Sequence, residues 1–258
     1  MKFGLIGHPI AHSLSPALFK AGYDGRYPYD LIETPDFEEA YQRFLYDYDG
    51  INVTAPFKEL AAQKADILSE ECRIIGATNL LVKTTEGIKA YNSDYLGVRL
   101  WLSDAVQGFF PTPEPHRKAR VLIVGMGGAG KAAAAAAESL GMETILMNRT
   151  RYSEYIKPLC HFREEFRKAD IVIYNLPIRI AELDSLTEED FCPGKPKHIL
   201  EANYRNPSFD KSLIQKMKST NPGLSYTEGR TWLLLQAVTG YELFTGEKPD
   251  LDRMTASL

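Results

Sequence analysis

A lysine and a threonine near the end of one short apolar run are the residues of this chain best suited to chemistry. They belong to the sequence Asn-Val-Thr-Ala-Pro-Phe-Lys at residues 52–58, in which Thr54 and Lys58 stand on either side of a proline. A lysine side chain can donate a proton to a reacting oxygen and take it back, and a hydroxyl can hold a ligand oxygen. Lys58 is therefore the first candidate for a catalytic acid–base residue.

Other polar side chains follow the predicted strands of the first hundred residues. These groups are Ser13 to Pro16, Thr78 with Asn79, and Asn92 to Asp94. Ligands of open parallel sheets bind beyond the carboxyl ends of the strands, so most of these groups can meet in one crevice. Hydroxyls, amides, one ammonium and one carboxylate suit a small polyhydroxylated molecule better than a lipid or a nucleotide. The alternative for each serine is a helix cap, and for Asn92 and Asp94 it is a turn or a cap.

Short apolar runs alternate with helical patterns along the chain, which predicts an α/β fold with parallel strand pairing. Ser15 and Pro16 predict an N-cap followed by proline at the first helical position. A proline-rich stretch at residues 107–118 cannot continue a helix and is the best candidate for a linker. Strands are expected at residues 3–7, 29–32, 51–53, 79–84, 87–91, 120–125, 144–147, 171–174 and 198–200. Helices are expected at residues 37–46, 57–68, 131–140, 213–217 and 231–244.

The second half contains the spacing Gly-x-Gly-x-x-Gly, from Gly125 to Gly130. Its glycines suit a tight turn, a close approach of the backbone to a pyrophosphate, and close packing of a helix on a strand. The pattern follows a predicted strand and opens a predicted helix, whose N–H groups and positive dipole end favour a phosphate. We therefore expect this loop to bind a dinucleotide. The alternative is a glycine turn needed only for packing.

The end of the next predicted strand indicates which dinucleotide binds. An NAD site usually places Asp or Glu there, against the ribose 2′-hydroxyl, whereas this chain has Asn148, Arg149, Thr150 and Arg151. Guanidinium groups suit a 2′-phosphate because they offer a planar fork of donors, and no acidic residue stands there to repel it. The sequence therefore favours NADP over NAD. The alternative is that both arginines are solvated surface residues.

Composition argues against several classes of partner. The chain has 258 residues, with 30 lysines and arginines against 34 aspartates and glutamates and a net charge of −4. No basic stripe indicates nucleic acid, and no apolar run has the length of a membrane span or a signal-peptide core. The cysteines Cys72, Cys160 and Cys192 lack metal-ligand spacing and fit a reducing compartment. We expect a cytoplasmic protein with no metal site and no nucleic-acid or membrane partner, either a monomer or a homodimer.

Taken together, these motifs resemble the shikimate dehydrogenase family. The matching pieces run in the family order and are residues 7–16, 52–58, 76–79 and 92–97, the glycine loop, Asn148 to Thr150, and Gly229 through Gln236 and Ala237. The glycine loop is generic, whereas the Ser-x-Ser-Pro, Asn-Val-Thr-x-Pro-x-Lys and Asn-x-Asp-x-x-Gly motifs together are specific. The resemblance implies an enzyme that reduces 3-dehydroshikimate to shikimate with NADPH, reversibly, in chorismate and aromatic amino acid biosynthesis.

The resemblance also implies a role for each matching position. Lys58 and Asp94 would form the catalytic pair, in which Lys58 moves the proton and Asp94 orients it. The residues that would hold the substrate are Ser13, Ser15, Thr54, Asn79, Tyr204 and Gln236. Those that would hold the phosphates and adenosine ribose of NADP are Gly125, Met126, Gly127, Gly128, Ala129, Asn148, Arg149, Thr150 and Arg151. The nicotinamide end would lie against Ala202 and Gly229.

The implied fold is α/β with two domains. Residues 1–103 and 232–258 would form a substrate domain on a mixed, mostly parallel sheet. Residues 104–231 would form a Rossmann-type domain that binds NADP.

The chain departs from the family pattern on the nucleotide side. The segment from Asn175 to Arg179 replaces the usual Asn-Ala-Thr motif and a following glycine, Glu201 stands in place of Asp, and Trp232 stands in place of Met. Two alternatives therefore stay open. One is a quinate or shikimate dehydrogenase paralogue that uses NAD, and the other is a shikimate-binding protein with weak catalysis.

Overall fold

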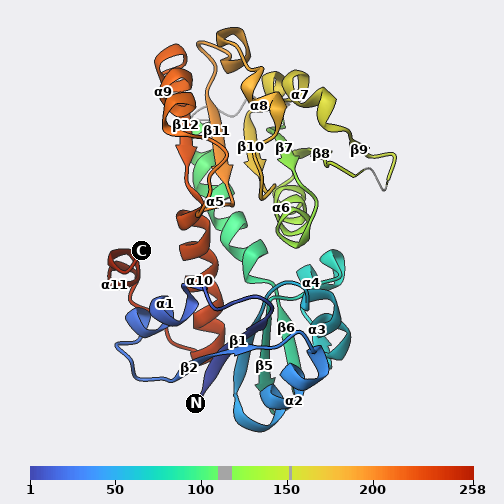
Figure 1. The fold of residues 1–258 in the computed structure, drawn as a ribbon, viewed down its shortest axis with the longest axis vertical. Helices are drawn as coiled ribbons and strands as arrows, with labels where there is room; N and C mark the ends of the chain where they lie inside the picture. Colours follow the sequence, from blue (N-terminus) through green and yellow to red (C-terminus); the bar gives the residue numbers. More distant parts are fainter. Residues whose placement is uncertain (110–117, 151–152) are drawn as a thin grey trace. The chain divides into compact units, whose positions relative to one another are not determined.

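The computed structural model describes residues 1–109, 118–150 and 153–258, and the chain divides into two compact units. The first unit is Met1–Gly97 with Leu234–Leu258, and the second is Val98–Leu233. Each unit is built on a six-stranded sheet of its own (Figure 1). Both divisions fall inside long helices, α5 (Ser93–Phe109) and α10 (Gly229–Thr245), and the expected domain boundaries lie in the same two helices.

The sheet of the first unit is mixed, as the family resemblance implies. Its strand order is β2-β1-β3-β5-β6-β4, in which β5 runs antiparallel to β3 and β6 while the remaining neighbours are parallel. The strands are β1 (Phe3–Gly7), β2 (Tyr29–Glu33), β3 (Gly50–Val53), β4 (Ile67–Leu68), β5 (Leu80–Thr84) and β6 (Gly87–Tyr91). The parallel strands β1 and β3 therefore end at one edge, next to Ser13 and Thr54 in the sequence.

Helices cover both faces of this sheet because successive strand residues point to opposite sides. Ile6, Ile51 and Val53 pack with the apolar residues of one set of helices, α2 (Phe37–Asp47), α3 (Lys58–Lys64) and α4 (Glu70–Ile75). On the other face, Phe3 stacks on Phe244 of α10 at 4.9 Å between ring centroids. The helices α1 (Ser15–Gly22) and α11 (Leu251–Ala256) pack against each other beside this aromatic cluster.

Three predictions about helix ends are wrong. Helix α1 begins at Ser15 itself, and Leu14 precedes it without a side-chain cap. The helix expected at residues 57–68 ends at Lys64, because β4 pairs with β6 instead and the Asp66 carboxylate accepts the N–H of Ile88 at 2.7 Å. Helix α5 continues to Phe109, since the helix-breaking prolines begin only at Pro111 and a single glycine costs a helix about 1 kcal/mol. Residues 110–117 of the expected linker lie outside the described residues.

The second unit has the Rossmann strand order. Its strands are β7 (Arg120–Val124), β8 (Glu143–Met147), β9 (Ile156–Lys157), β10 (Ile171–Tyr174), β11 (Lys197–Glu201) and β12 (Leu224–Thr227). Their order is β12-β11-β10-β7-β8-β9 and every neighbouring pair is parallel. The order reverses beside β7, so the carboxyl ends of β7 and β10 flank the switch point where dinucleotides bind in this fold.

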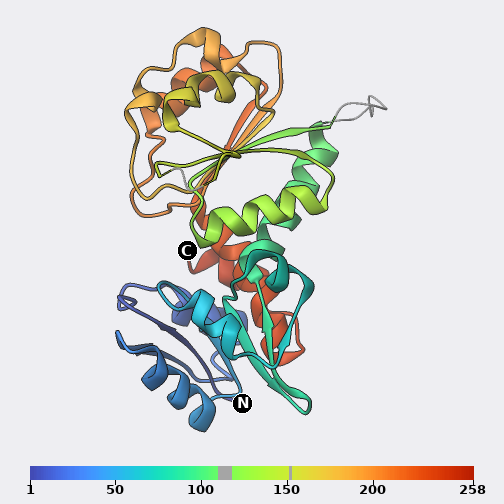
Figure 2. The same cartoon turned by 90° about the vertical axis from the view of Figure 1, so that its right-hand side faces the viewer.

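Helix α6 (Gly128–Ser139) lies on one face of the second sheet, while α7 (Phe162–Lys168) and α9 (Lys211–Thr220) cover the other (Figure 2). Alanines fill residues 132–137 of α6 and all are buried. Small side chains let this helix approach β7 and β8 closely. The opposite face holds an apolar core around Phe162 and Phe166 of α7 and Met217 of α9.

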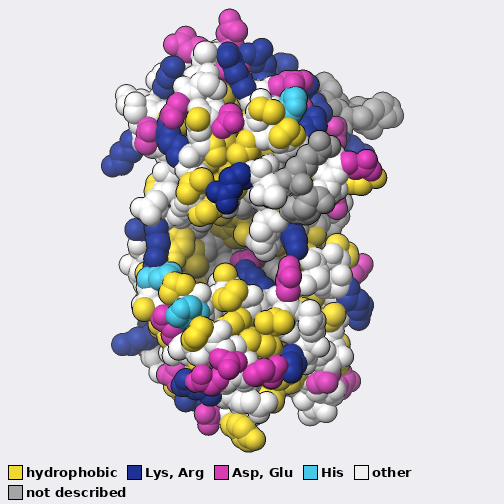
Figure 3. Space-filling model, turned by 45° about the vertical axis from the view of Figure 1, so that its right-hand side comes forward, with side chains coloured by type: hydrophobic (Ala, Val, Ile, Leu, Met, Phe, Trp, Pro, Cys, Tyr) yellow, Lys and Arg dark blue, Asp and Glu magenta, His cyan; other side chains and the backbone are white. Residues whose placement is uncertain are grey.

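Charged side chains of both signs are interspersed on each unit over the face drawn in Figure 3. In the part of the chain that the structure describes, no helix is both apolar enough and long enough to cross a membrane.

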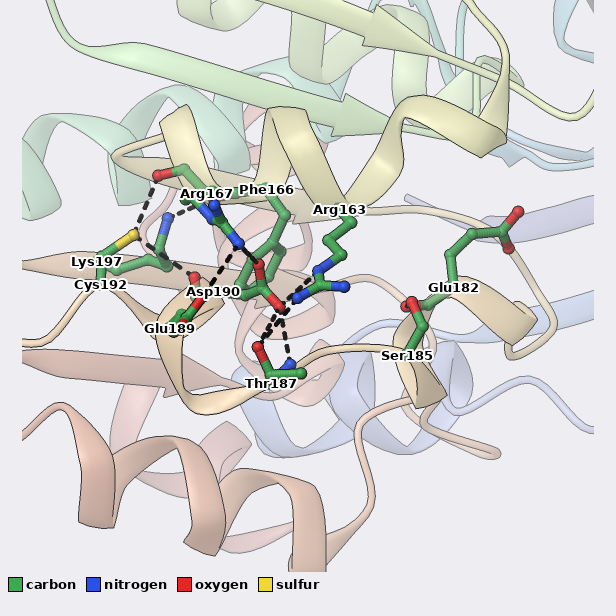
Figure 4. A network of polar contacts seen from close by, with 10 residues as sticks. All are labelled: Arg163, Phe166, Arg167, Glu182, Ser185, Thr187, Glu189, Asp190, Cys192 and Lys197. Atoms are coloured by element: carbon green, nitrogen blue, oxygen red, sulfur yellow. Dashed lines mark hydrogen bonds and ion pairs between the residues drawn. The ribbon is translucent and has the colours of Figure 1, made fainter.

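A buried carboxylate ties α7 to the 3-10 turn η2 (Glu188–Phe191) in the second unit (Figure 4). Asp190 is fully buried and accepts bonds from Arg163 Nε at 2.8 Å and from a terminal nitrogen of Arg167 at 2.6 Å. The backbone N–H of Thr187 donates to the same carboxylate at 2.8 Å. Burial alone would raise the pKa of Asp190, but the Thr187 N–H and the two guanidinium groups outweigh it and lower that pKa to about 2.

Candidate active site

Lys58 and Asp94 form an ion pair in the first unit. The Lys58 Nζ lies 2.5 Å from Asp94 Oδ2, and the two side chains are 20% and 16% exposed. Lys58 is the first residue of α3 and Asp94 the second residue of α5. An ammonium has three N–H donors, of which this bond uses one, so the pair can hold a ligand hydroxyl and move its proton.

Asn92 fixes the start of α5 and therefore the position of Asp94. Its Oδ1 accepts the N–H of Tyr95 at 3.1 Å, and its amide nitrogen donates to the carbonyl of Ala77 at 3.2 Å. Asn92 is thus a helix cap, which was the expected alternative to a substrate ligand at this position. The buried Asn92 side chain also anchors the helix to the segment that precedes Asn79.

Ser93 joins two of the predicted substrate ligands, Asn79 and Gln236. Its backbone N–H donates to Asn79 Oδ1 at 2.7 Å and its Oγ accepts from Asn79 Nδ2 at 3.0 Å. The same hydroxyl lies 3.0 Å from Gln236 Oε1 and donates to it. Ser93 is fully buried, so it sits behind the two amides rather than at the surface of the site.

Two glycines let α5 and α10 approach closely enough for this bond. A Cβ at Gly97 would lie 2.7 Å from the backbone nitrogen of Gln236, and a Cβ at Gly240 would lie 3.1 Å from Ser93 Oγ. Larger residues would therefore push the two helices apart. Ser93 is not among the substrate-holding residues expected from the sequence. Its only signals were the Asn-Ser-Asp motif and the glycines four residues after Ser93 and Gln236.

Ser13 and Ser15 lie together at the start of α1. Ser13 Oγ donates to Ser15 Oγ at 3.1 Å and accepts the backbone N–H of Ser15 at 3.2 Å. The Tyr241 hydroxyl donates to the carbonyl of Ser15 at 3.1 Å, and burial raises the pKa of Tyr241 above its usual range. This tyrosine of α10 therefore holds the serine turn in place as a neutral donor.

Thr54 lies just beyond β3, opposite the end of β1. A Cβ at Gly7 would lie 2.4 Å from Thr54 Cγ2, so glycine at that position makes room for the threonine. The first unit thus holds Lys58 paired with Asp94, Asn79 linked to Gln236 through Ser93, and the serine pair of α1.

The glycine loop of the second unit shows which of its glycines serve packing. Gly125 has φ +95°, and a Cβ at Gly130 would lie 1.9 Å from the Gly125 carbonyl oxygen. A Cβ at Gly127 would meet nothing within 4 Å. Packing therefore explains Gly125 and Gly130 but not Gly127, whose position suits the approach of a phosphate to the backbone.

Gly128 and Ala129 open α6, a helix of 12 residues whose N-cap Gly127 makes no side-chain cap bond. Its first N–H groups are suited to a phosphate. Asn148 Oδ1 accepts the N–H of Met126 at 3.3 Å, and Asn148 Nδ2 donates to the carbonyl of Thr150 at 3.0 Å. Asn148 therefore ties the glycine loop to the turn after β8.

Arg149 and Thr150 are exposed in the turn after β8, and Arg151 lies outside the described residues. Ala202 follows β11, and its N–H donates to the Tyr174 carbonyl at 2.8 Å. A Cβ at Gly229 would lie 2.5 Å from the Ala202 carbonyl oxygen, so the two predicted nicotinamide neighbours are in contact. Tyr204 lies in the segment that follows Ala202, in the second unit. Among the described residues, no group of three His, Cys, Asp or Glu side chains is placed to bind a metal ion.

Two family models match the chain. Residues 5–81 match the shikimate dehydrogenase substrate binding domain. Residues 78–217 match the NAD binding domain of D-isomer specific 2-hydroxyacid dehydrogenases.

Curated relatives cover nearly the whole chain. Shikimate dehydrogenase (NADP(+)) of Caldanaerobacter subterraneus is 31% identical, over 97% of this chain and 93% of the relative. The enzyme of the same name from Thermus thermophilus is 34% identical, over 97% and 94%.

Solved structures show the same fold. Shikimate 5-dehydrogenase of Thermus thermophilus, in complex with NADP(H) and shikimate, has a TM-score of 0.79 at 25% identity and covers 100% of this chain and 98% of that one. Quinate dehydrogenase of Corynebacterium glutamicum in complex with NAD has a TM-score of 0.81 at 22% identity and covers 100% and 98%. At that identity the second likeness speaks for the fold alone.

Proposed function

This chain belongs to the shikimate dehydrogenase family, and from that premise we propose that it reduces 3-dehydroshikimate to shikimate with NADPH, reversibly. The Lys58–Asp94 pair, at 2.5 Å and close to the amides that Ser93 joins, carries the proposal. It supplies one mobile proton beside donors and acceptors for ring hydroxyls. That is the chemistry a hydroxylated ring acid requires.

In this proposal Lys58 donates its proton to the carbonyl oxygen during reduction and takes it back from the hydroxyl during oxidation. Asp94 orients the Lys58 ammonium and accepts a bond from the reacting hydroxyl. Proton transfer of this kind contributes roughly 10²- to 10⁴-fold to the rate. Bound NADPH would supply the hydride. The hydroxyls and the carboxylate of the substrate would be held by Ser13, Ser15, Thr54, Asn79, Tyr204 and Gln236.

The second unit is the proposed NADP domain. Gly125, Gly127 and the start of α6 would bind the pyrophosphate, as the space beside Gly127 supports. Arg149, with Thr150 and Arg151, would bind the 2′-phosphate. Ala202 and Gly229 would lie against the nicotinamide.

Turnover tests the proposal directly. We expect NADPH, followed at its ~340 nm absorption band, to form from shikimate and NADP, with a lower kcat/KM for quinate and for NAD. Higher efficiency with quinate and NAD would favour the paralogue, whose fold the quinate dehydrogenase shares. Tight shikimate binding without turnover would identify a binding protein and overturn the proposal.

Replacing Lys58 by alanine tests the assigned chemistry. We expect kcat to fall by roughly 10²-fold or more, while the Kd for shikimate changes little, because the variant removes the proton-transfer group. Steady-state kinetics and a shikimate titration of the same variant measure the two quantities. A near-normal kcat would exclude Lys58 from proton transfer.

A further inference from the structure

Two segments of the second unit follow neighbouring strands at the carboxyl edge of the sheet. The departures from the family pattern at residues 175–179 and at Glu201 lie in the first segment and directly before the second. The segment 175–180 follows β10, and the segment 202–209 follows β11 and carries Ala202 and Tyr204. Neither segment contains a helix or strand residue. Backbone hydrogen bonds attach Asn175 and Ala202, the first residue of each segment, and side-chain contacts add to these.

Arg179 joins the first segment to the end of the second. One of its terminal nitrogens donates to the carbonyl of Ser208 and, at 3.0 Å, to Asp210 Oδ2. Its Nε and other terminal nitrogen bind Asp184 Oδ1 at 2.9 and 2.6 Å. Arg179, in the segment that departs from the family pattern, thus uses its planar fork to cross-link three pieces of chain.

Glu201, the last residue of β11, also holds the end of the second segment, at Ser208 and Phe209. Its carboxylate is fully buried and accepts the backbone N–H groups of Ser208 and Phe209, the latter at 3.2 Å. The hydroxyl of Tyr226 donates to it at 2.7 Å. Three donors thus converge on one carboxylate, which satisfies its charge in a buried place.

Asn203 and Tyr174 complete the attachment. Asn203 Nδ2 donates to the Pro177 carbonyl at 3.3 Å and to the Asn206 carbonyl at 2.8 Å. The buried Tyr174 hydroxyl donates to the Ile178 carbonyl at 2.7 Å. Tyr204 therefore lies next to one attached residue, Asn203, and four residues before another, Ser208.

We propose that Arg179 and Glu201 are positioning residues, which fix the segment 202–209 so that Tyr204 and Ala202 are presented to substrate and nicotinamide. The role given to Tyr204 and Ala202 rests on the proposed function. The attachment of the segment by Arg179 and Glu201 does not. Arg179 and Glu201, which belong to the two departures from the family pattern, then act together to hold the same segment. Without these bonds the segment would sample many conformations, and binding would have to order it.

Limited proteolysis tests the attachment without any activity. Arg205 is exposed in the middle of the segment. Trypsin cleaves after it only when the surrounding chain opens locally into an extended conformation. We expect Arg179→Ala to raise the rate of cleavage after Arg205 by at least about fivefold, and Glu201→Gln to do the same. Cleavage after Lys218, exposed in α9, should stay unchanged in the same digest, because only the segment is released.

Arg120→Ala is the matched control. Arg120 is as exposed as Arg179, at 32%, and its ion pair with Glu143 lies in the same unit. It should leave cleavage after Arg205 as in the wild type. Equal rises at Arg205 and Lys218 would indicate general unfolding, and no rise at Arg205 would show that Arg179 does not hold the segment. Either result overturns the proposal.

Kinetics test the purpose of the attachment. We expect Arg179→Ala to raise the KM for shikimate by roughly five- to tenfold with a smaller change in kcat. Inhibition by 2′,5′-ADP, which lacks the nicotinamide, should keep its constant within about twofold, because the phosphate end of the site is intact. An unchanged KM for shikimate in a variant with a released segment would refute the positioning role. Absence of turnover in the wild type would instead refute the proposed function, and the proteolysis would still decide the attachment.

Discussion

Ser93 controls the orientation of two side-chain amides from a fully buried position. An amide can flip, and which end faces the substrate depends on its hydrogen-bond partners. Here the backbone N–H of Ser93 fixes the Asn79 oxygen, and its hydroxyl fixes the Gln236 oxygen. The orientations of both amides are then set before any ligand binds.

Ser93→Ala should therefore raise the KM for shikimate by roughly five- to twentyfold, the equivalent of about 1–2 kcal/mol, with a smaller effect on kcat. The cause is that the Gln236 oxygen and the Asn79 amide nitrogen each lose the Ser93 hydroxyl. The substrate must then order the Gln236 amide, while the backbone N–H of residue 93 still holds the Asn79 oxygen. Ser103→Ala is the control, because that hydroxyl of α5 bonds the Arg99 carbonyl of its own helix at 2.9 Å. If both variants behave alike, the bridge has no role in binding.

Arg149 should decide the choice of cofactor. A 2′-phosphate carries close to two negative charges, and bonds to a charged group contribute about 1.5–3 kcal/mol each. Arg149→Ala should therefore weaken NADP by roughly ten- to a hundredfold and leave NAD nearly unaffected. Michaelis constants for both cofactors, in wild type and variant, measure this. Equal weakening of the two would show that Arg149 does not bind the phosphate.

Among the elements of the second unit, α7 is tied to η2 by one buried carboxylate, Asp190 (Figure 4). Asp190→Asn removes the charge that Arg163 and Arg167 share and should destabilise the protein by about 2–3 kcal/mol at neutral pH. Asp184→Asn is the control, since the Asp184 side chain is 63% exposed and an exposed pair with Arg179 contributes at most about 1 kcal/mol. Thermal unfolding of both variants gives the comparison.

The effect of Asp190 should depend on pH in a defined direction. Its pKa is lowered from 3.8 to about 2 in the folded protein, so its contribution is complete above about pH 4. The contribution is lost as the pH falls through 2, because the folded state then takes up the proton as well. The gap in Tm between wild type and Asp190→Asn should therefore narrow between pH 4 and pH 2. A constant gap over that range would mean that the carboxylate charge is not the source of the stability.

The elements show which features sequence patterns can predict. The strands that have regular apolar runs were predicted in both sheets, and so was the glycine loop, because local period and spacing determine them. The pairing of Ile67 and Leu68 as β4 was missed, since it depends on a partner strand about twenty residues away. The contact of Ser93 with Gln236 was missed for the same reason, because it spans 143 residues and depends on how two helices cross. Arg179 and Glu201 stood out only as departures, and their bonds could be seen only in the fold.

At the scale of the whole molecule, the predicted ligand set is divided between two units with separate cores. Lys58, Asp94 and the residues around Ser93 belong to the first unit. The glycine loop, Arg149 and Tyr204 belong to the second. Each unit is thus expected to be stabilised mainly by its own ligand.

Hydrogen exchange followed by mass spectrometry tests this division in the intact protein. A ligand at about 100 times its Kd stabilises the state that binds it by about 2.7 kcal/mol, which slows exchange through opening by up to about 100-fold. 2′,5′-ADP should slow exchange in β7 and α6 and leave β3 and α3 unchanged. Shikimate should protect β3, α3 and the start of α5, and in the second unit only the segment 202–209. Equal protection of both units by either ligand would contradict the division, since each ligand would then stabilise residues that it is not proposed to touch.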